Sequence, residues 1–171
     1  MPNLGVWIPP DSSRGHSKTD DGGSGSSGLV LCDVPGLIDG AAKGAGLGHA
    51  FLRHVERCHV ILHLVDATSI DPLGDFRMIN GELRRYGDGA LALKPQVVVV
   101  NKIDAWDNQK MEDFEIGLTV KYTRSSLESE LLASMSHNRL LWMSAKHKEG
   151  VDELMGRMYS FVQKVKAQIS N

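Results

Sequence analysis

The 171-residue sequence has few cysteines, little net charge and no long apolar run. Its two cysteines, Cys32 and Cys58, lack CxxC spacing, so we expect free thiols in a reducing compartment. The net charge of −2 gives no electrostatic argument for nucleic-acid binding, although a local basic face is compatible with it. The sequence shows no membrane span and no signal peptide. These absences point to a soluble globular chain, long enough for one domain with its own core.

Aliphatic and aromatic residues are missing from residues 9–28, where eleven of the twenty residues are glycine or serine. A segment of this composition cannot bury enough surface to become ordered. We therefore predict a flexible Gly/Ser-rich loop within the domain. Because serine is frequent, a phosphorylated or partner-binding loop is the alternative.

Short apolar runs alternate with amphipathic segments along the rest of the chain. We predict strands at 29–32, 59–65, 97–100 and 140–143, and helices at 47–57, 72–86 and 151–169. Residues 108–136 have a mostly helical but interrupted pattern. The unbroken run of four valines at 97–100 is typical of a strand that is buried on both faces. This alternation predicts an α/β fold with a mostly parallel, open sheet and flanking helices.

Ligands of such sheets bind beyond the carboxyl ends of the strands. The residues that follow the valine run are Asn101, Lys102, Ile103 and Asp104. The Asp104 carboxylate can accept hydrogen bonds from N1–H and the exocyclic amine of guanine, whereas adenine would leave it unpaired. Asn101 can contact guanine N7 or tie neighbouring loops together, and the stem of Lys102 can lie along the base. A polar loop that leads into a helix is the alternative for this motif alone.

Ser144, Ala145 and Lys146 follow the last predicted strand, about forty residues after Asp104. The N–H of Ala145 can donate to guanine O6, where adenine carries an amine instead. Two short motifs at two strand ends are much more specific than either one alone. Together they predict a guanine pocket.

The first predicted strand ends in Asp33, Val34, Pro35 and Gly36. The Asp33 carboxylate would hold Mg²⁺ through water, and the Gly36 amide would reach a γ-phosphate oxygen. Five glycines lie between Gly36 and Gly48. They predict a segment that is ordered by the phosphate and released when the phosphate is lost. A plain strand-to-loop turn is the alternative.

These motifs lie within the stretches PNLGV, GLIDGAAKGAGLGHAFLRH, KPQVVVVNKID and MSAKHKEGVDEL. In this order, they closely resemble the G domain of the Obg (CgtA) family of ribosome-associated P-loop GTPases. The resemblance covers residues 1–8 and 29–104 and weakens from there to residue 140. It implies a partial, TRAFAC-like G domain over residues 1–171, without its first strand, P-loop and first helix. It also implies that Asp33–Gly36 bind Mg²⁺ and γ-phosphate, that Asn101–Asp104 bind guanine and that Ser144–Lys146 complete the base pocket.

The resemblance further implies a function. The family binds GTP and GDP, hydrolyses GTP with Mg²⁺, and acts in ribosome assembly, mainly on the rRNA and ribosomal proteins of the large subunit. We expect a cytoplasmic protein, or one of a plastid or mitochondrion in a eukaryote.

Two features depart from the usual GTPase pattern. Leu37 follows Gly36 where many GTPases have a glutamine that orients water, and the resemblance suggests potassium and a partner protein instead. The sequence contains no GxxxxGK[ST], so the family's P-loop and switch threonine would lie upstream of Met1. A central strand, its helix and the P-loop would then be absent between the strands at 29–33 and 59–65, which leaves unpaired edges.

Two explanations of the missing P-loop stay open. The chain is a piece of a longer GTPase, or it is a short paralogue that binds nucleotide weakly and serves as a binding module without turnover. Two smaller features have plain explanations. His59 and His63 share a strand face without a third metal ligand, which favours packing. Arg84 and Arg85 could face a ribosome, but a solvated helix face is the commoner explanation.

Overall fold

The computed structural model describes residues 3–10, 28–33, 49–106 and 122–170. In chain order, these residues form β1 (Asn3–Trp7), β2 (Leu29–Asp33), α2 (His49–Glu56), β3 (Ile61–Asp66), α3 (Pro72–Arg85), the 3₁₀ turn η2 (Ala90–Leu93), β4 (Gln96–Asn101), α5 (Arg124–Ala133), β5 (Leu140–Trp142) and α6 (Val151–Ile169). The predicted helices and strands are present within a few residues of their expected bounds. Neither β1 nor η2 was predicted.

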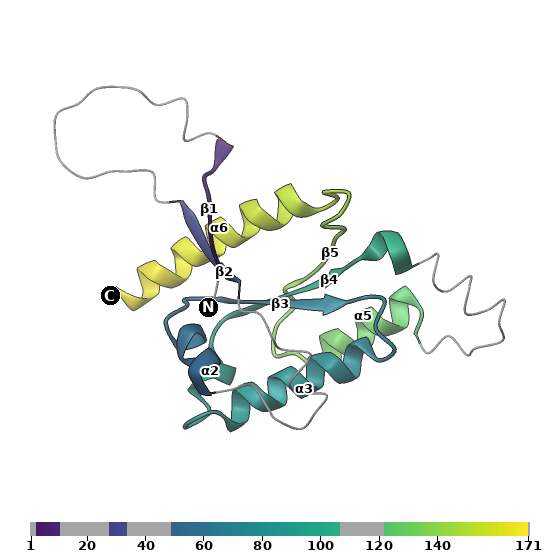
Figure 1. Cartoon of the computed structure of the whole chain (residues 1–171), viewed down its shortest axis with the longest axis horizontal. Helices are drawn as coiled ribbons and strands as arrows, with labels where there is room; N and C mark the ends of the chain where they lie inside the picture. The colour runs from purple at the N-terminus through teal and green to yellow at the C-terminus, as the bar shows by residue number, and fades with distance from the viewer. Residues whose placement is uncertain (1–2, 11–27, 34–48, 107–121, 171) are drawn as a thin grey trace.

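The centre of the fold is a parallel sheet with the strand order β3-β4-β5. Helices α3 and α5 lie on one face of this sheet and α6 lies on the other (Figure 1). The register places Asp66 opposite Asn101 and Val100 opposite Trp142, so the carboxyl ends of the three strands meet at one edge. The predicted α/β architecture with flanking helices is confirmed.

Strand β4 is the middle of the core because its valines point alternately to both faces. Val98 and Val100 pack with residues of α3 and α5, such as Phe76 and Leu127. Val97 and Val99 pack instead with the apolar face of α6. Burial on both sides is what the unbroken valine run predicts, since a half-exposed strand would alternate apolar and polar residues.

Helix starts are set by local chemistry. Asp71 caps α3 by accepting a hydrogen bond from Gly74 N at 3.0 Å, and Pro72 occupies the first helical turn, where no N–H is needed. Thr123 and Ser126 form a reciprocal capping box at the start of α5. These caps fix where α3 and α5 begin, and apolar packing holds both helices against the sheet.

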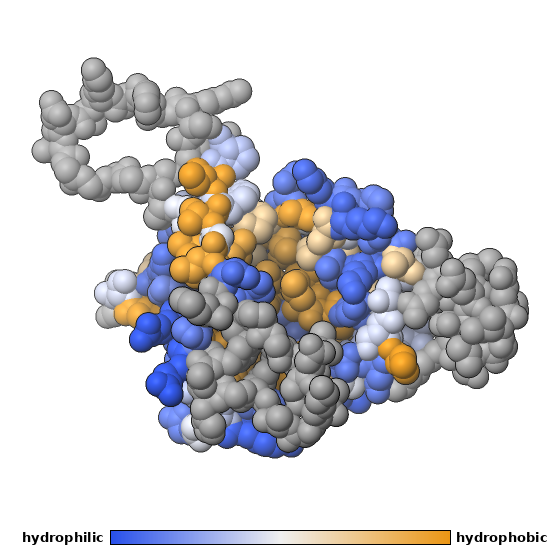
Figure 2. Space-filling view, viewed as in Figure 1, coloured by the Kyte–Doolittle hydropathy of each residue, from blue (hydrophilic) through white to orange (hydrophobic). Residues whose placement is uncertain are grey.

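Strands β1 and β2 form a separate, antiparallel two-stranded sheet. Leu29 packs in the α6 cluster, and the Trp7 ring lies 6.0 Å from that of Tyr159 on α6. The opposite face of this pair carries Leu4 and Val6, which are 72% and 68% exposed (Figure 2).

The prediction of one mostly parallel sheet therefore holds for β3, β4 and β5 but not for β2. No described residue pairs β2 with β3. The break lies where the sequence leads us to expect a missing central strand, and β2 pairs with β1 instead.

Several predictions fall on residues outside the described ranges. Most of the expected 9–28 loop, the glycine-rich residues 34–48 and the 107–121 part of the ambiguous helical region belong there. Among the described helices, none combines the length and apolar character needed to cross a bilayer.

Candidate functional site

The candidate site is the edge where β3, β4 and β5 end. Asp66 ends β3, Asn101 ends β4, and Ser144 lies two residues after β5. Two backbone hydrogen bonds join the ends of β4 and β5: Met143 N donates to Val100 O at 2.9 Å, and Ile103 N donates to Met143 O at 3.3 Å. The two predicted base-binding motifs are thus brought side by side by the parallel pairing of their strands.

Asn101 ties the two motif loops together. Its Oδ1 accepts a hydrogen bond from Ala145 N at 3.0 Å. Of the two roles that the sequence leaves open for Asn101, the structure has the loop-tying one. The same bond engages the Ala145 N–H, which we predict to donate to guanine O6. Binding of guanine there requires that this N–H be shared between the two acceptors or change partner.

Ser144 holds Asp104 in place. The Ser144 hydroxyl is fully buried and donates to Asp104 Oδ1 at 2.6 Å, while it accepts a hydrogen bond from His147 N at 3.1 Å. The hydrogen bond from Ser144 lowers the pKa of Asp104 from its usual value, and the positive potential of His147 and Lys146 adds to this effect. Asp104 is therefore a fixed, ionised acceptor at neutral pH.

The second carboxylate oxygen of Asp104 has a different neighbour. His147 Nε2 lies 3.7 Å from Oδ2, and the Asp104 side chain is 16% exposed. A protonated His147 would form an ion pair with Asp104. The carboxylate thus keeps acceptor capacity toward solvent on the side away from Ser144.

Lys102 links β4 to β3. It adopts a positive φ of 69°, and its Nζ lies 2.6 Å from Asp66 Oδ2. The N–H and hydroxyl of Thr68 both donate to Asp66 Oδ1, at 2.9 and 2.7 Å. Partial burial acts to raise the pKa of Asp66, but the hydrogen bonds from Lys102 and Thr68 outweigh it and lower the pKa. The Lys102 stem therefore spans the two strand ends, and its side chain stays 54% exposed.

The loop after Ser144 closes with a tight turn. Ser144 N donates to Glu149 O at 3.0 Å, while Lys148 and Gly150 have positive φ angles of 60° and 74°. Lys146 lies exposed on this turn. The turn leads directly into α6, so the position of the predicted base-binding loop is coupled to the start of that helix.

The predicted phosphate-side motif is described only in part. Asp33 ends β2 opposite Asn3 and is exposed, whereas Val34, Pro35 and Gly36 lie outside the described residues. An exposed carboxylate fits water-mediated Mg²⁺ binding. The described part of the chain contains no group of three or more histidine, cysteine or acidic residues suited to a metal ion. The Mg²⁺ prediction thus depends here on Asp33 alone.

The suggested histidine pair does not converge on a site. His63 is 5% exposed and its ring lies 4.9 Å from that of Phe76, while His59 is exposed. His63 thus packs in the core, in agreement with the plain explanation of this residue.

Some contacts of the site were not anticipated from the sequence. Asp66 was recognised as a strand end, but its ion pair with Lys102 was not. His147 was not singled out, although it follows Ser144 by three residues. Both contacts depend on how loops from different strands approach each other, for which the sequence pattern contains no direct signal.

Comparison with known proteins gives a consistent result. Residues 12–102, more than half of the chain, match the family described as 50S ribosome-binding GTPase. A GTPase Obg of Synechococcus sp. (strain JA-2-3B'a(2-13)) is 40% identical over 159 residues, covering 93% of this chain and 38% of the relative. A GTPase Obg of Synechocystis sp. (strain ATCC 27184 / PCC 6803 / Kazusa) is 38% identical over 167 residues, which cover 98% of this chain and 38% of the relative.

The chain spans about two fifths of the length of these curated relatives. Its matches agree with the motifs at the strand ends and with the α/β architecture that carries them. The chain belongs to the 50S ribosome-binding GTPase family.

Proposed function

We propose that this protein binds guanine nucleotides at the carboxyl ends of β4 and β5 and hydrolyses GTP in the assembly of the large ribosomal subunit. The observation that carries the base specificity is the Ser144–Asp104 hydrogen bond of 2.6 Å. It orients a carboxylate whose pKa is lowered, beside the loop that begins at Ser144. The family membership and the names of the relatives support the GTPase activity and the ribosomal role.

Base recognition would use acceptors and donors that are already in place. Asp104 would accept the N1–H and exocyclic amine of guanine, and adenine offers no matching pair of donors there. The N–H of Ala145 would donate to O6, shared with the Oδ1 of Asn101 that it contacts in the structure. Lys102 would pack its stem along the base, since its Nζ is held at the Asp66 carboxylate.

Phosphate chemistry would depend on residues on the β2 side. We propose that Asp33 holds Mg²⁺ through water and that Val34, Pro35 and Gly36 approach the γ-phosphate. Bound Mg²⁺ would neutralise charge on the phosphates. Leu37 cannot orient a water molecule, so hydrolysis needs a further group, and a role for potassium stays an expectation from the resemblance.

The 171 residues by themselves should bind nucleotide weakly. They contain no GxxxxGK[ST], whose backbone amides and lysine cradle the phosphates in this class of protein. A binding module without turnover is the second candidate function. Isothermal titration and a phosphate-release assay on the 171-residue chain test this impaired binding. Micromolar GTP binding with turnover would contradict the impaired binding proposed here.

The base pocket is tested by Asp104→Asn in a version of the protein that carries a GxxxxGK[ST] segment upstream of Met1. An amide at this position restores complementarity to xanthine, so preference should move from guanosine to xanthosine nucleotides by at least about tenfold. Competition between GDP and XDP for the same protein measures this change of preference. Asp152→Asn, an exposed change in the first turn of α6, is the matched control. Unchanged guanine selectivity in Asp104→Asn would remove Asp104 from the pocket.

A further inference from the structure

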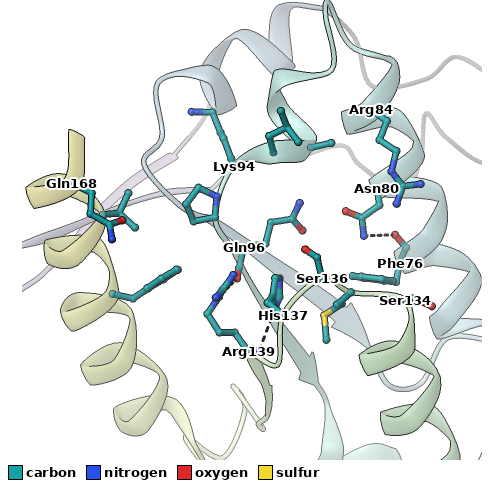
Figure 3. Close-up of a pocket in the computed structure, with 16 residues that line it drawn as sticks. Phe76, Asn80, Arg84, Lys94, Gln96, Ser134, Ser136, His137, Arg139 and Gln168 are labelled. Atoms are coloured by element: carbon teal, nitrogen blue, oxygen red, sulfur yellow. Dashed lines mark hydrogen bonds between the residues drawn. The ribbon is translucent and has the colours of Figure 1, made fainter. Parts of the chain in front are cut away.

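A groove of about 570 Å³ lies at the edge of the sheet opposite the candidate nucleotide site (Figure 3). Gln96 at the start of β4 and Arg139 just before β5 form its floor. Residues of α3 and α6 contribute to its walls. The length of β4 separates this edge from Asn101 by roughly 16 Å. The groove is thus a separate surface from the base-binding loops.

The charge of the groove is positive. Arg84 from α3, Lys94 before β4 and Arg139 before β5 all line it, and its lining contains no aspartate or glutamate. The Nζ of Lys94 donates to Cys58 O at 2.8 Å, so Arg84 and Arg139 are the cations that face a ligand most directly. The whole chain has a net charge of −2, so this concentration of cations is local. Arg84 forms no ion pair or hydrogen bond with the described residues, whereas its neighbour Arg85 pairs with Glu82 at 3.1 Å. The two adjacent arginines of α3 therefore differ, and only Arg84 faces the groove.

Arg139 is held in a fixed position. Its Nε donates to Gln96 O at 2.7 Å, and its guanidinium lies 4.7 Å from the centre of the Phe161 ring. Within the described part of the chain, its other guanidinium N–H groups have no hydrogen-bond partner, so they are open to a ligand. A planar cation supported from one side by an aromatic ring also offers its opposite face for stacking by a base.

Two neutral groups add donors to the groove. Gln96 is 7% exposed, and its side-chain amide has no hydrogen-bond partner among the described residues, although it lies in the middle of the groove (Figure 3). His137 Nδ1 accepts a hydrogen bond from Arg139 N at 3.2 Å, so the proton of the neutral ring is on Nε2, which is a donor. Among the described residues, the buried side-chain polar atoms without a partner belong to His63 and Trp142, so the Gln96 amide reaches solvent in the groove and is open to a ligand there.

We propose that this groove binds a single-stranded RNA segment, with its phosphates on Arg84 and Arg139 and a base beside Gln96 and His137. The choice of RNA among polyanions rests on the proposed ribosomal role and on the stacked guanidinium. An acidic peptide would satisfy the cations, but it has no planar group for Arg139 and no base edge for Gln96. The separation from the nucleotide site allows both ligands to be bound together.

The test is fluorescence anisotropy of the 171-residue chain with a labelled RNA of about twelve nucleotides that contains no guanine. A guanine-free probe avoids the base pocket, so its result is independent of the proposed GTP binding. Arg84→Glu should weaken binding at least about tenfold and reduce the slope of log affinity against log salt by about 0.7. Arg85→Glu makes the same charge change one residue away and should alter affinity less than about twofold.

Gln96→Met tests the neutral donor, because it keeps the volume and charge of the site. It should weaken RNA binding severalfold with an unchanged salt slope, while circular dichroism verifies that the fold is kept. Equal effects of Arg84→Glu and Arg85→Glu would overturn the groove as the site. Stronger competition by a polyglutamate peptide or by inorganic phosphate than by unlabelled RNA would overturn RNA as the ligand. Neither result bears on the guanine-selectivity test of Asp104→Asn, so the RNA proposal and the GTP proposal can fail separately.

Discussion

At the scale of single residues, the hydroxyl of Ser144 has two hydrogen-bond partners. It donates to Asp104, accepts from the His147 N–H and is shielded from water by complete burial. A buried hydroxyl with both functions satisfied orients its acceptor more strictly than a solvated one. Ser144 is thus a positioning residue for the Asp104 carboxylate.

Ser144→Ala should raise the pKa of Asp104 toward its usual value, because the largest cause of its lowering is removed. A carboxyl group whose pKa is lower in the folded than in the unfolded protein stabilises the fold at pH values above its unfolded pKa. This stabilisation is lost as the pH falls through the folded-state pKa. In Ser144→Ala, the contribution should be smaller. Carbon-13 NMR titration of the Asp104 carboxyl carbon measures the shift. Ser160→Ala, an exposed position on α6, is the control, and an unmoved Asp104 titration in Ser144→Ala would contradict the assigned role.

His63 should make stability depend on pH. Burial lowers its pKa from 6.5 to about 4, and neither ring nitrogen has a hydrogen-bond partner among the described residues. Between these two values, the unfolded chain binds a proton that the folded chain does not, so the free energy of unfolding should fall by ~3 kcal/mol as the pH drops from 6.5 toward 4.

His63→Phe should remove this slope, since phenylalanine keeps the ring against Phe76 without a titrating group. Urea unfolding at several pH values measures the slope. His59→Gln changes an exposed histidine and should leave it intact. A slope that survives in His63→Phe would have to come from other groups.

At the scale of secondary-structure elements, the start of α6 decides where the Ser144–Lys146 loop lies. Gly150 precedes the helix with a φ of 74°, and a Cβ there would lie 2.9 Å from Trp142 O, on β5. Glycine is required here because its backbone adopts a positive φ and because a side chain would collide with the Trp142 carbonyl oxygen. The helix, the tight turn and the end of β5 therefore form one connected unit under the site.

Gly150→Ala should destabilise the protein by about 1–3 kcal/mol, because it places a side chain in the left-handed region and against a backbone oxygen. Gly156→Ala is the matched control: nothing lies within 4 Å of its added Cβ, and alanine favours the middle of a helix by about 1 kcal/mol. Thermal unfolding should show opposite shifts for the two variants. Shifts of the same sign would contradict the backbone argument.

At the scale of the whole molecule, the described residues form two sheets, and one of them is packed against the helices much more extensively than the other. The parallel sheet is buried between α3 and α5 on one face and α6 on the other. The β1–β2 pair contacts the rest through one face only, where Leu29 and Trp7 pack on the α6 side. Fewer buried contacts imply a lower local free energy of opening.

Hydrogen exchange should therefore be slowest at Val97–Val100 and faster in β1 and β2. Trp7→Ala should reduce protection in β1 and β2 at least about tenfold and leave β4 nearly unchanged, because it removes contacts between the pair and α6 alone. Leu4→Ala changes the exposed outer face of the same strand and is the control. If β4 lost protection together with β1 and β2, the two sheets would unfold as one unit.

Much of the fold and the outline of the site could be predicted because the signals are local. The valine run marks a doubly buried strand, and Asn101–Asp104 and Ser144–Lys146 are recognisable by residue type and by their position after strands. β1 was missed because five exposed or half-buried residues around Gly5 have little strand signal of their own. It forms a strand because β2 lies beside it.

The sequence by itself determined the alternation of strands and helices, the family and the residues that end each strand. The tertiary structure decided which atoms of those residues meet. The bond from Ala145 to Asn101 and the ion pair of Lys102 with Asp66 follow from parallel register between distant segments. The basic groove has the same origin, since Arg84, Lys94 and Arg139 come from three separate elements. Hydrogen bonds and charge clusters depend on distances in space, which a pattern along the chain does not contain.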